Sequence, residues 1–202
     1  MEAAEKALRT LSAARYADVR VLRQHSVQVA WRGDSSEHLE SKVSRLVCRC
    51  IANGYGVAYV DVDDGVDGGE LGEKALRRAM AAEGDIQPVE VRVEKGEKRW
   101  LVKEEFDLER VEEIILGLRG AVYDHIGNAE FRLETVVTFT LTDSTLITSE
   151  GTRVREVTPL TDLVAYLIVR AAGEGFSSLC VGGVGGLETV AGWEHLVEEF
   201  VS

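Results

Sequence analysis

The sequence predicts an α+β fold: a mostly antiparallel or mixed β-sheet flanked by helices. Segments with helical periodicity are each followed by blocks of strand-like segments joined by short turns. The strand–helix–strand alternation typical of a doubly wound parallel sheet is missing. Because domains usually hold roughly 100–200 residues, the 202 residues are interpreted as a single domain, 1–202.

The chain begins with a predicted amphipathic helix, residues 2–15, whose inward positions are Ala3, Ala7, Leu8, Leu11 and Ala14. From Ala17 the apolar residues alternate, which indicates β-structure. We expect two strands here, joined near residues 24–26, with the second ending at Gly33 and Asp34.

A β-hairpin is the sharpest local prediction. The strands Lys42–Ile51 and Tyr55–Val62 are separated by Asn53 and Gly54. Asn-Gly favours a type I′ turn, because both residues tolerate positive φ.

Next come a loop over Asp61–Gly69 and a helix over Glu70–Glu83, with Leu71, Ala75, Leu76, Ala79 and Met80 facing inward. A strand is expected after Pro88, where Val89, Val91 and Val93 alternate with charged residues.

The second half predicts a helix capped by Asp107 and ending near Ile126, with an apolar stripe of Leu108, Val111, Ile114, Ile115, Leu118 and Val122. Four strands follow, over residues 130–141, 145–149, 152–158 and 162–172. A last helix is expected over Leu187–Phe200.

The charge pattern argues against nucleic acid as a partner. The formal charge is −12, with 16 basic and 17 acidic side chains in residues 1–100 but 7 and 18 in residues 101–202. Nucleic-acid binding needs clustered Lys and Arg.

Membrane and secreted proteins are also disfavoured. The longest uncharged aliphatic run, Leu163–Val169, is far shorter than the ~20 residues that cross a bilayer. No leader precedes the first helix, and three Cys are too few for a disulfide framework. We therefore expect a cytoplasmic, soluble protein.

The His and Cys residues form no recognised catalytic or metal motif. None of His25, His38, His125 and His195 is followed by Glu, which excludes a zincin-type helix. His125 is interpreted as a surface residue at a helix C-terminus. Cys48 and Cys50, two apart on a strand, are interpreted as small core residues. A metal site that they form with Cys180 is the alternative.

The acidic loop Asp61–Asp67 does not fit an EF-hand, since Val66 and Gly72 stand where Gly and Glu are required. A looser cation site and a solvated turn both remain open.

A glycine cluster precedes the last expected helix. A dinucleotide fingerprint fails there because Glu188 stands where Gly or Ala is needed, and phosphate binding remains a weak alternative. The sharper hypothesis is that glycines let another backbone approach a sheet edge, so the candidate peptide-facing or partner-facing residues are Gly182, Gly183, Gly185 and Gly186.

Three segments in order, 16–21, 50–59 and 148–152, resemble the N-terminal domain of the TldD/PmbA family, the modulators of DNA gyrase. The third is followed by a long strand and the Gly-Gly-x-Gly-Gly stretch, as in the family. The family's usual Gly-x-Gly-x-Arg run is replaced here by Leu46–Cys50. The resemblance covers nearly the whole chain.

The resemblance implies a zinc metallopeptidase family whose His-Glu-x-x-x-His helix lies in a C-terminal domain. It also implies homodimers, or TldD/TldE heterodimers, that hold an extended peptide. The sequence stops at Ser202, before that helix would begin, so the catalytic domain is expected to be absent. No catalytic, cofactor or metal residue is assigned, and zinc is expected only in a partner catalytic chain.

The preferred hypothesis is therefore a non-catalytic peptide-binding and assembly module, either a free-standing subunit or half of a split enzyme. The alternative is a self-contained enzyme or cation-binding protein that uses a site built from Asp61, Asp63, His125 or Cys50. A degenerate structural homologue without a peptide ligand is the third possibility.

Overall fold

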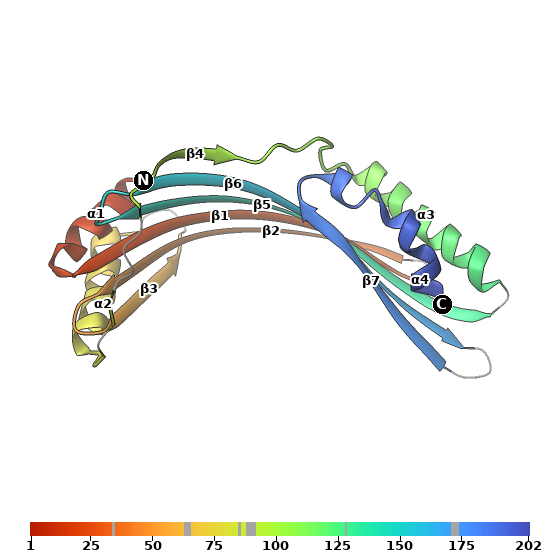
Figure 1. Ribbon diagram of the computed structural model, residues 1–202, viewed down its shortest axis with the longest axis horizontal. Coiled ribbons are helices and arrows are strands. Elements are labelled where there is room, and N and C mark those ends of the chain that lie inside the picture. The colour runs from red at the N-terminus through yellow and green to blue at the C-terminus, as the bar shows by residue number, and fades with distance from the viewer. Residues whose placement is uncertain (34, 63–65, 85, 88–91, 128, 171–173) are drawn as a thin grey trace. The chain divides into compact units, whose positions relative to one another are not determined.

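A computed structural model describes residues 1–33, 35–62, 66–84, 86–87, 92–127, 129–170 and 174–202. Its helices are α1 (Glu2–Thr10), α2 (Gly68–Ala81), α3 (Leu108–Ile126) and α4 (Val197–Val201) (Figure 1). Its strands are β1 (Tyr16–Arg32), β2 (Ser35–Ile51), β3 (Tyr55–Asp61), β4 (Lys95–Arg99), β5 (Glu130–Thr148), β6 (Arg153–Arg170) and β7 (Glu174–Val184).

The strands form a mixed sheet in the order β3-β2-β1-β5-β6-β4, with β7 also paired to β6. β2 and β3 pair antiparallel, as do β6 and β7, whereas β4 runs parallel to β6. The predicted α+β class is confirmed. No helix within the described ranges combines the length and apolarity needed to cross a bilayer.

The chain divides into two compact units. Unit 1 comprises residues 1–24, 42–99 and 142–157, and unit 2 comprises residues 25–41, 100–141 and 158–202. The chain passes from one unit to the other within β1, β2, β5 and β6. The assignment of residues 1–202 to one domain stays a prediction.

In unit 1, α1 and α2 cover a core formed with β1, β2, β3 and β5, including Val19, Leu46, Cys48, Ala58 and Ile147. Asp67 begins α2 by accepting a bond from the Gly69 N–H at 2.7 Å, and its other oxygen lies 2.8 Å from Nζ of Lys6. The stripe of α2 is buried at Leu71, Ala75 and Ala79, but Met80 is 57% exposed, contrary to prediction.

In unit 2, α3 and the C-terminal segment cover a second core. The predicted cap is confirmed, since Asp107 Oδ1 accepts a bond from the Arg110 N–H at 2.9 Å. The predicted stripe is buried except for Leu108, which lies in the first turn and is 43% exposed. Trp193 and Phe200 pack into the same core.

The break predicted near residues 24–26 is wrong, because β1 is one strand through Arg32. Neighbouring strands supply polar partners here: Ser26 Oγ lies 3.0 Å from Thr140 Oγ1, and His25 lies 2.8 Å from Glu40. The polar residues therefore pair across the sheet and do not end the strand. For the same reason β2 begins at Ser35, before its predicted start.

The four strands predicted after residue 130 are two. β5 continues through Asp143, whose carboxylate is bonded by Arg155, and β6 continues through Pro159. The predicted turn over residues 149–151 is confirmed as the break between them.

The 51–55 hairpin is confirmed, with Ile51 opposite Tyr55. Its turn is not type I′, because neither Asn53 nor Gly54 has a positive φ. A Cβ at Gly54 would lie 2.7 Å from that of Ala82, so close packing beside the end of α2 explains the glycine.

The C-terminal prediction is wrong in two respects. β7 was not expected, and residues 187–200 form two short 3₁₀ turns followed by α4, with Gly192 between the turns. The expected strand residues Val89 and Val91 lie outside the described ranges, as do Asp34, Asp63 and residue 172. Val93 is not in a strand.

Candidate functional site

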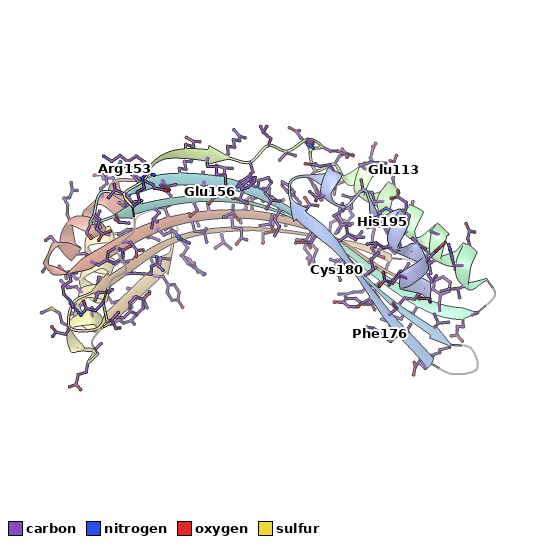
Figure 2. The ribbon with its side chains drawn as sticks, viewed as in Figure 1. Glu113, Arg153, Glu156, Phe176, Cys180 and His195 are labelled. Carbon is purple, nitrogen blue, oxygen red and sulfur yellow. The ribbon has the colours of Figure 1, made fainter. Side chains whose placement is uncertain are left out.

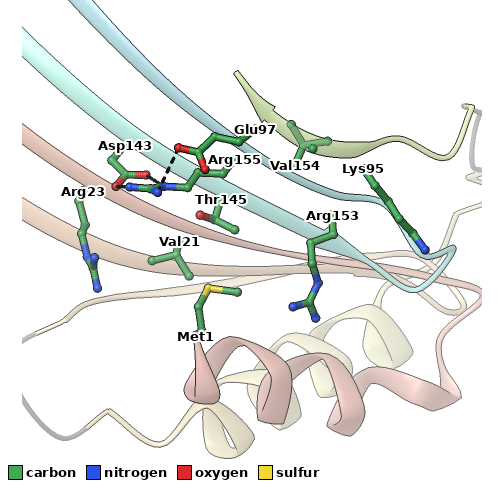
Figure 3. A pocket seen from close by; sticks show the side chains of 11 residues that line it. Met1, Val21, Arg23, Lys95, Glu97, Asp143, Thr145, Arg153, Val154 and Arg155 are labelled. Atoms are coloured by element: carbon green, nitrogen blue, oxygen red, sulfur yellow. Dashed lines mark hydrogen bonds and ion pairs between the residues drawn. The ribbon is translucent and has the colours of Figure 1, made fainter. Parts of the chain in front are cut away.

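Unit 1 contains a hollow of about 700 Å³ on the sheet face that also carries α1 (Figure 3). Its charged lining consists of Arg23, Lys95, Glu97, Asp143, Arg153 and Arg155, and Met1, Val21, Thr145 and Val154 add apolar and hydroxyl surface. We call this region the basic hollow, because four cations and two carboxylates line it. The cations come from β1, β4 and β6.

Arg155 holds the two carboxylates of the basic hollow (Figure 3). Its Nε and Nη2 donate to the two oxygens of Asp143 at 3.0 and 2.7 Å, and Nη1 donates to Glu97 at 3.2 Å. The Arg155 hydrogen bonds hold the pKa of Asp143 below its usual value. Arg155 thus ties β4, β5 and β6 together and keeps Asp143 ionised.

The other three cations of the basic hollow, Arg153, Arg23 and Lys95, differ in whether they already have a partner. Arg153 Nη2 donates to Glu5 of α1 at 3.0 Å. The side chains of Arg23 and Lys95 form no hydrogen bond or ion pair with any residue that the structure describes, although the charge of Arg23 helps Arg155 to lower the pKa of Asp143. They are the cations left available to a ligand.

Sequence reasoning missed the basic hollow. Its cations lie at positions 23, 95, 153 and 155, and only the pair 153–155 forms a local pattern. The parallel pairing of Lys95 with Arg153 and of Glu97 with Arg155 brings these segments together.

The four predicted glycines lie in unit 2. Gly182 and Gly183 are in β7, where Gly182 is exposed and faces Asp162 of β6 in the register. Gly185 and Gly186 are buried, and Gly185 has φ +153°. A Cβ at Gly186 would collide with the carbonyl of Glu104, so packing within the chain accounts for this glycine.

Glu188 fixes the same segment. Its two carboxylate oxygens accept bonds from the N–H groups of Lys103 and Glu104, at 3.1 and 2.9 Å. Burial alone would raise the pKa of Glu188, but bonds from the backbone N–H groups of Lys103, Gly186 and Glu104 outweigh it and lower the pKa to about 2. The residue that ruled out a dinucleotide fingerprint therefore has a structural role.

β7 presents apolar side chains beside these glycines. Phe176 is 69% exposed and stacks on Tyr166 of β6, with ring centroids 6.2 Å apart. Figure 2 shows Phe176 and Cys180 on β7. Within the described sheet β7 pairs only with β6, so its outer edge has no strand partner there.

Within unit 1, Asp61 and Cys50 of the alternative hypothesis are not brought together. Asp61 pairs with Arg45 at 2.6 Å, and the strand register puts it on the opposite sheet face from Cys50. His125 Nδ1 bonds the Ala121 carbonyl at the end of α3, in unit 2. Asp63 lies outside the described residues.

The cysteine prediction is confirmed for the core pair. Cys48 and Cys50 are buried and Cys180 is exposed, all as free thiols. Burial, with the neighbouring Cys50, raises the pKa of Cys48 to about 12, and burial also raises the pKa of Cys50. In the described ranges no three His, Cys, Asp or Glu side chains converge, so these residues do not offer the donor set of a zinc site.

Comparison with known proteins relates the fold to solved structures. No protein-family model and no curated protein matches the sequence. TldE from Thermococcus kodakarensis superposes with a TM-score of 0.68 at 14% identity, covering 98% of this chain and 46% of TldE. The chain has the fold of the part of TldE that it matches.

Two modulators of DNA gyrase match equally well. The one from Bacteroides thetaiotaomicron has a TM-score of 0.71 at 11% identity, covering 99% of this chain and 49% of that one. The one from Thermotoga maritima has a TM-score of 0.68 at 10% identity, covering 98% and 46%. The chain thus spans about half the length of TldE and of both modulators, and the predicted resemblance is confirmed for the fold.

Proposed function

We propose that the chain is a TldD/PmbA-family module that binds an extended peptide and assembles with a catalytic chain. The observation that carries this proposal is the match of 98–99% of the chain to 46–49% of TldE and two modulators of DNA gyrase. The zinc ion and the peptidase chemistry that the family resemblance implies are assigned to the partner chain.

The outer edge of β7 is the proposed peptide site. An edge strand offers a row of N–H and C=O groups to which an extended peptide can add as a further strand. Gly183 has no side chain to obstruct the approaching backbone, whereas a Cβ at Gly182 would collide with Thr161 and Asp162 of β6, so packing within the sheet accounts for that glycine. The exposed ring of Phe176 adds apolar area along the same strand.

Peptide binding is tested by fluorescence anisotropy with labelled acetyl-Thr-Val-Thr-Val-Thr-Val-amide. A Cβ at Gly183 meets only Thr189 atoms at 4.0 Å, so Gly183→Val adds bulk at the proposed edge, and an unchanged melting temperature shows that the variant folds. We expect saturable binding that Gly183→Val weakens by about tenfold, which is about 1.4 kcal/mol.

The matched control is Gly120→Val: Gly120 is exposed on α3, outside the proposed site, and a Cβ there meets nothing within 4 Å. It should bind like the unmodified chain. Equal affinity for both variants would remove β7 as the peptide site.

Assembly is tested with a chain from the same organism that carries a His-Glu-x-x-x-His motif. A 1:1 mixture should elute as one complex in size-exclusion chromatography under native conditions. Separate elution across micromolar concentrations would contradict the assembly role. The cytoplasmic location also belongs to this proposal, and the three free thiols are consistent with a reducing compartment.

A further inference from the structure

We propose that the basic hollow of unit 1 binds an acidic peptide through two carboxylates, one received by Arg23 and the other by Lys95. This site is separate from β7, and it adds a chemical preference to the proposed peptide-binding role.

The charge of the basic hollow opposes that of the chain. Four cations and two carboxylates line it, whereas the whole chain carries a formal charge of −12. A concave surface lined mainly by one sign of charge concentrates the opposite sign. Anionic groups are therefore the favoured ligands of this hollow.

Arg153 and Arg155 are occupied by Glu5, Asp143 and Glu97, as described above. The side chains of Arg23 and Lys95 form no ion pair within the described residues, and both are exposed; the Asp143 carboxylate, whose charge Arg23 feels, is itself held by Arg155. Figure 3 shows Arg23 and Lys95 on opposite sides of the Arg155 network.

Strand spacing sets the lateral separation of the strands that carry Arg23 and Lys95. Arg23 is on β1 and Lys95 is on β4. In the order β1-β5-β6-β4 these two strands are separated by three interstrand spacings. At about 4.8 Å each, the strands lie about 14 Å apart. Residues i and i+4 of an extended peptide are about 13 Å apart, so two acidic residues at that spacing match the lateral separation of β1 and β4, and the long Arg23 and Lys95 side chains can adjust to the remaining offset along the strands.

Carboxylates fit the hollow better than phosphates do. Both groups can accept two parallel bonds from the Arg23 guanidinium, so the charges around it decide between them. Asp143 and Glu97 stand in the same hollow, and their charges repel a phosphate dianion more strongly than a carboxylate. Met1 and Val21 offer apolar surface to the aliphatic part of a Glu side chain.

The test uses isothermal titration with acetyl-Glu-Ala-Thr-Ala-Glu-amide, its Gln-for-Glu analogue, the shorter acetyl-Glu-Ala-Glu-amide and inorganic phosphate. We expect the first peptide to bind tightest, about tenfold tighter than the shorter one, and to weaken as salt is raised from 50 to 300 mM. Arg23→Gln and Lys95→Gln should each weaken it by about tenfold.

Arg20→Gln is the matched control, because Arg20 is exposed on the same strand but on the opposite sheet face. It should bind like the unmodified chain, and unchanged melting temperatures show that all three variants fold. Equal binding of the Gln analogue, tighter binding of phosphate, equal binding of the shorter peptide, or full affinity in both Arg23→Gln and Lys95→Gln overturns the proposal. Gly183→Val should leave binding of the acidic peptide intact. The proposals for β7 and for the basic hollow are therefore tested separately.

Discussion

Nε of Arg49 in β2 donates a hydrogen bond to Oδ1 of Asp18 in β1 at 2.8 Å, and the Asp18 side chain is only 3% exposed. The Arg49 side chain is 40% exposed, so its guanidinium connects a buried carboxylate to solvent. Burial and a hydrogen bond to Asp18 also raise the pKa of Tyr16. This pair links the two strands on the sheet face opposite α1 and α2.

Replacing Arg49 should destabilise the protein, because the Asp18 carboxylate would stay buried without its cation. We expect Arg49→Met to lower the free energy of unfolding by about 2 kcal/mol, less than for a fully buried pair because solvent screens the exposed guanidinium. Urea unfolding followed by circular dichroism measures it.

The neighbouring pair Arg45–Asp61 supplies the control, since both partners are exposed and Arg45→Met should cost much less. Adding Asp18→Asn to Arg49→Met should recover part of the loss. Equal effects of Arg49→Met and Arg45→Met would show that burial of Asp18 is unimportant.

Glu188 should make stability depend on acid. Its pKa is about 2 in the folded chain against an ordinary value of 4.5, so its carboxylate stabilises the fold above pH 4.5 and loses that effect as the pH falls towards 2. Glu188→Gln should lower Tm by about 2–4 °C at pH 7 and flatten the decline in stability between pH 4.5 and 2. Thermal melts across that pH range provide the measurement, and Glu105→Gln, at an exposed position, is the reference. If Tm fell with pH in parallel for Glu188→Gln and the unmodified chain, Glu188 would not have this role.

Substitution by alanine should change the stability of the protein in opposite directions at two glycines of α3. A Cβ at Gly120 meets nothing within 4 Å, so Gly120→Ala should stabilise the helix by about 0.5–1 kcal/mol. A Cβ at Gly117 would lie 3.1 Å from the Trp193 ring, so Gly117→Ala must displace a packed indole and should destabilise by about 1 kcal/mol or more. Chemical denaturation of the two variants decides; a gain in stability for Gly117→Ala is incompatible with the packing described.

The cysteines should differ sharply in reactivity. Cys180 is exposed, while Cys48 and Cys50 are buried with raised pKa values and little thiolate at pH 8. Iodoacetamide should add one group to the native protein and three after denaturation in guanidinium chloride, as counted by mass spectrometry. Rapid labelling of Cys48 in native buffer would contradict its burial.

The sequence predicts the elements whose periodicity or cap is local. Asp107 and the stripe from Val111 to Val122 define α3, and the run around Asn53 and Gly54 defines a hairpin. The extent of the long strands was beyond local patterns, because residues such as Ser26 and Asp143 are stabilised by partners more than ten residues away. β7 is rich in Gly and Ser, and its pairing with β6 defines it as a strand.

The same distinction applies to the candidate sites. The glycine segment was visible as a local motif, although its buried members prove to pack within the chain. The basic hollow was invisible, because a cation at position 23 and another at 95 share a surface only after β1, β5, β6 and β4 have been placed in order.

The passage of four strands from one compact unit to the other has a consequence for how the protein acquires its structure. Each unit is assembled from three separate stretches of sequence, so a single truncation of the chain yields neither unit by itself. The contact of Glu5 with Arg153 spans 148 positions, and that of Ala17 with Ser149 spans 132. Such high contact order makes for slow folding, because long loops must close before the contacts that stabilise them can form. Synthesis must reach β6 before either unit can be completed.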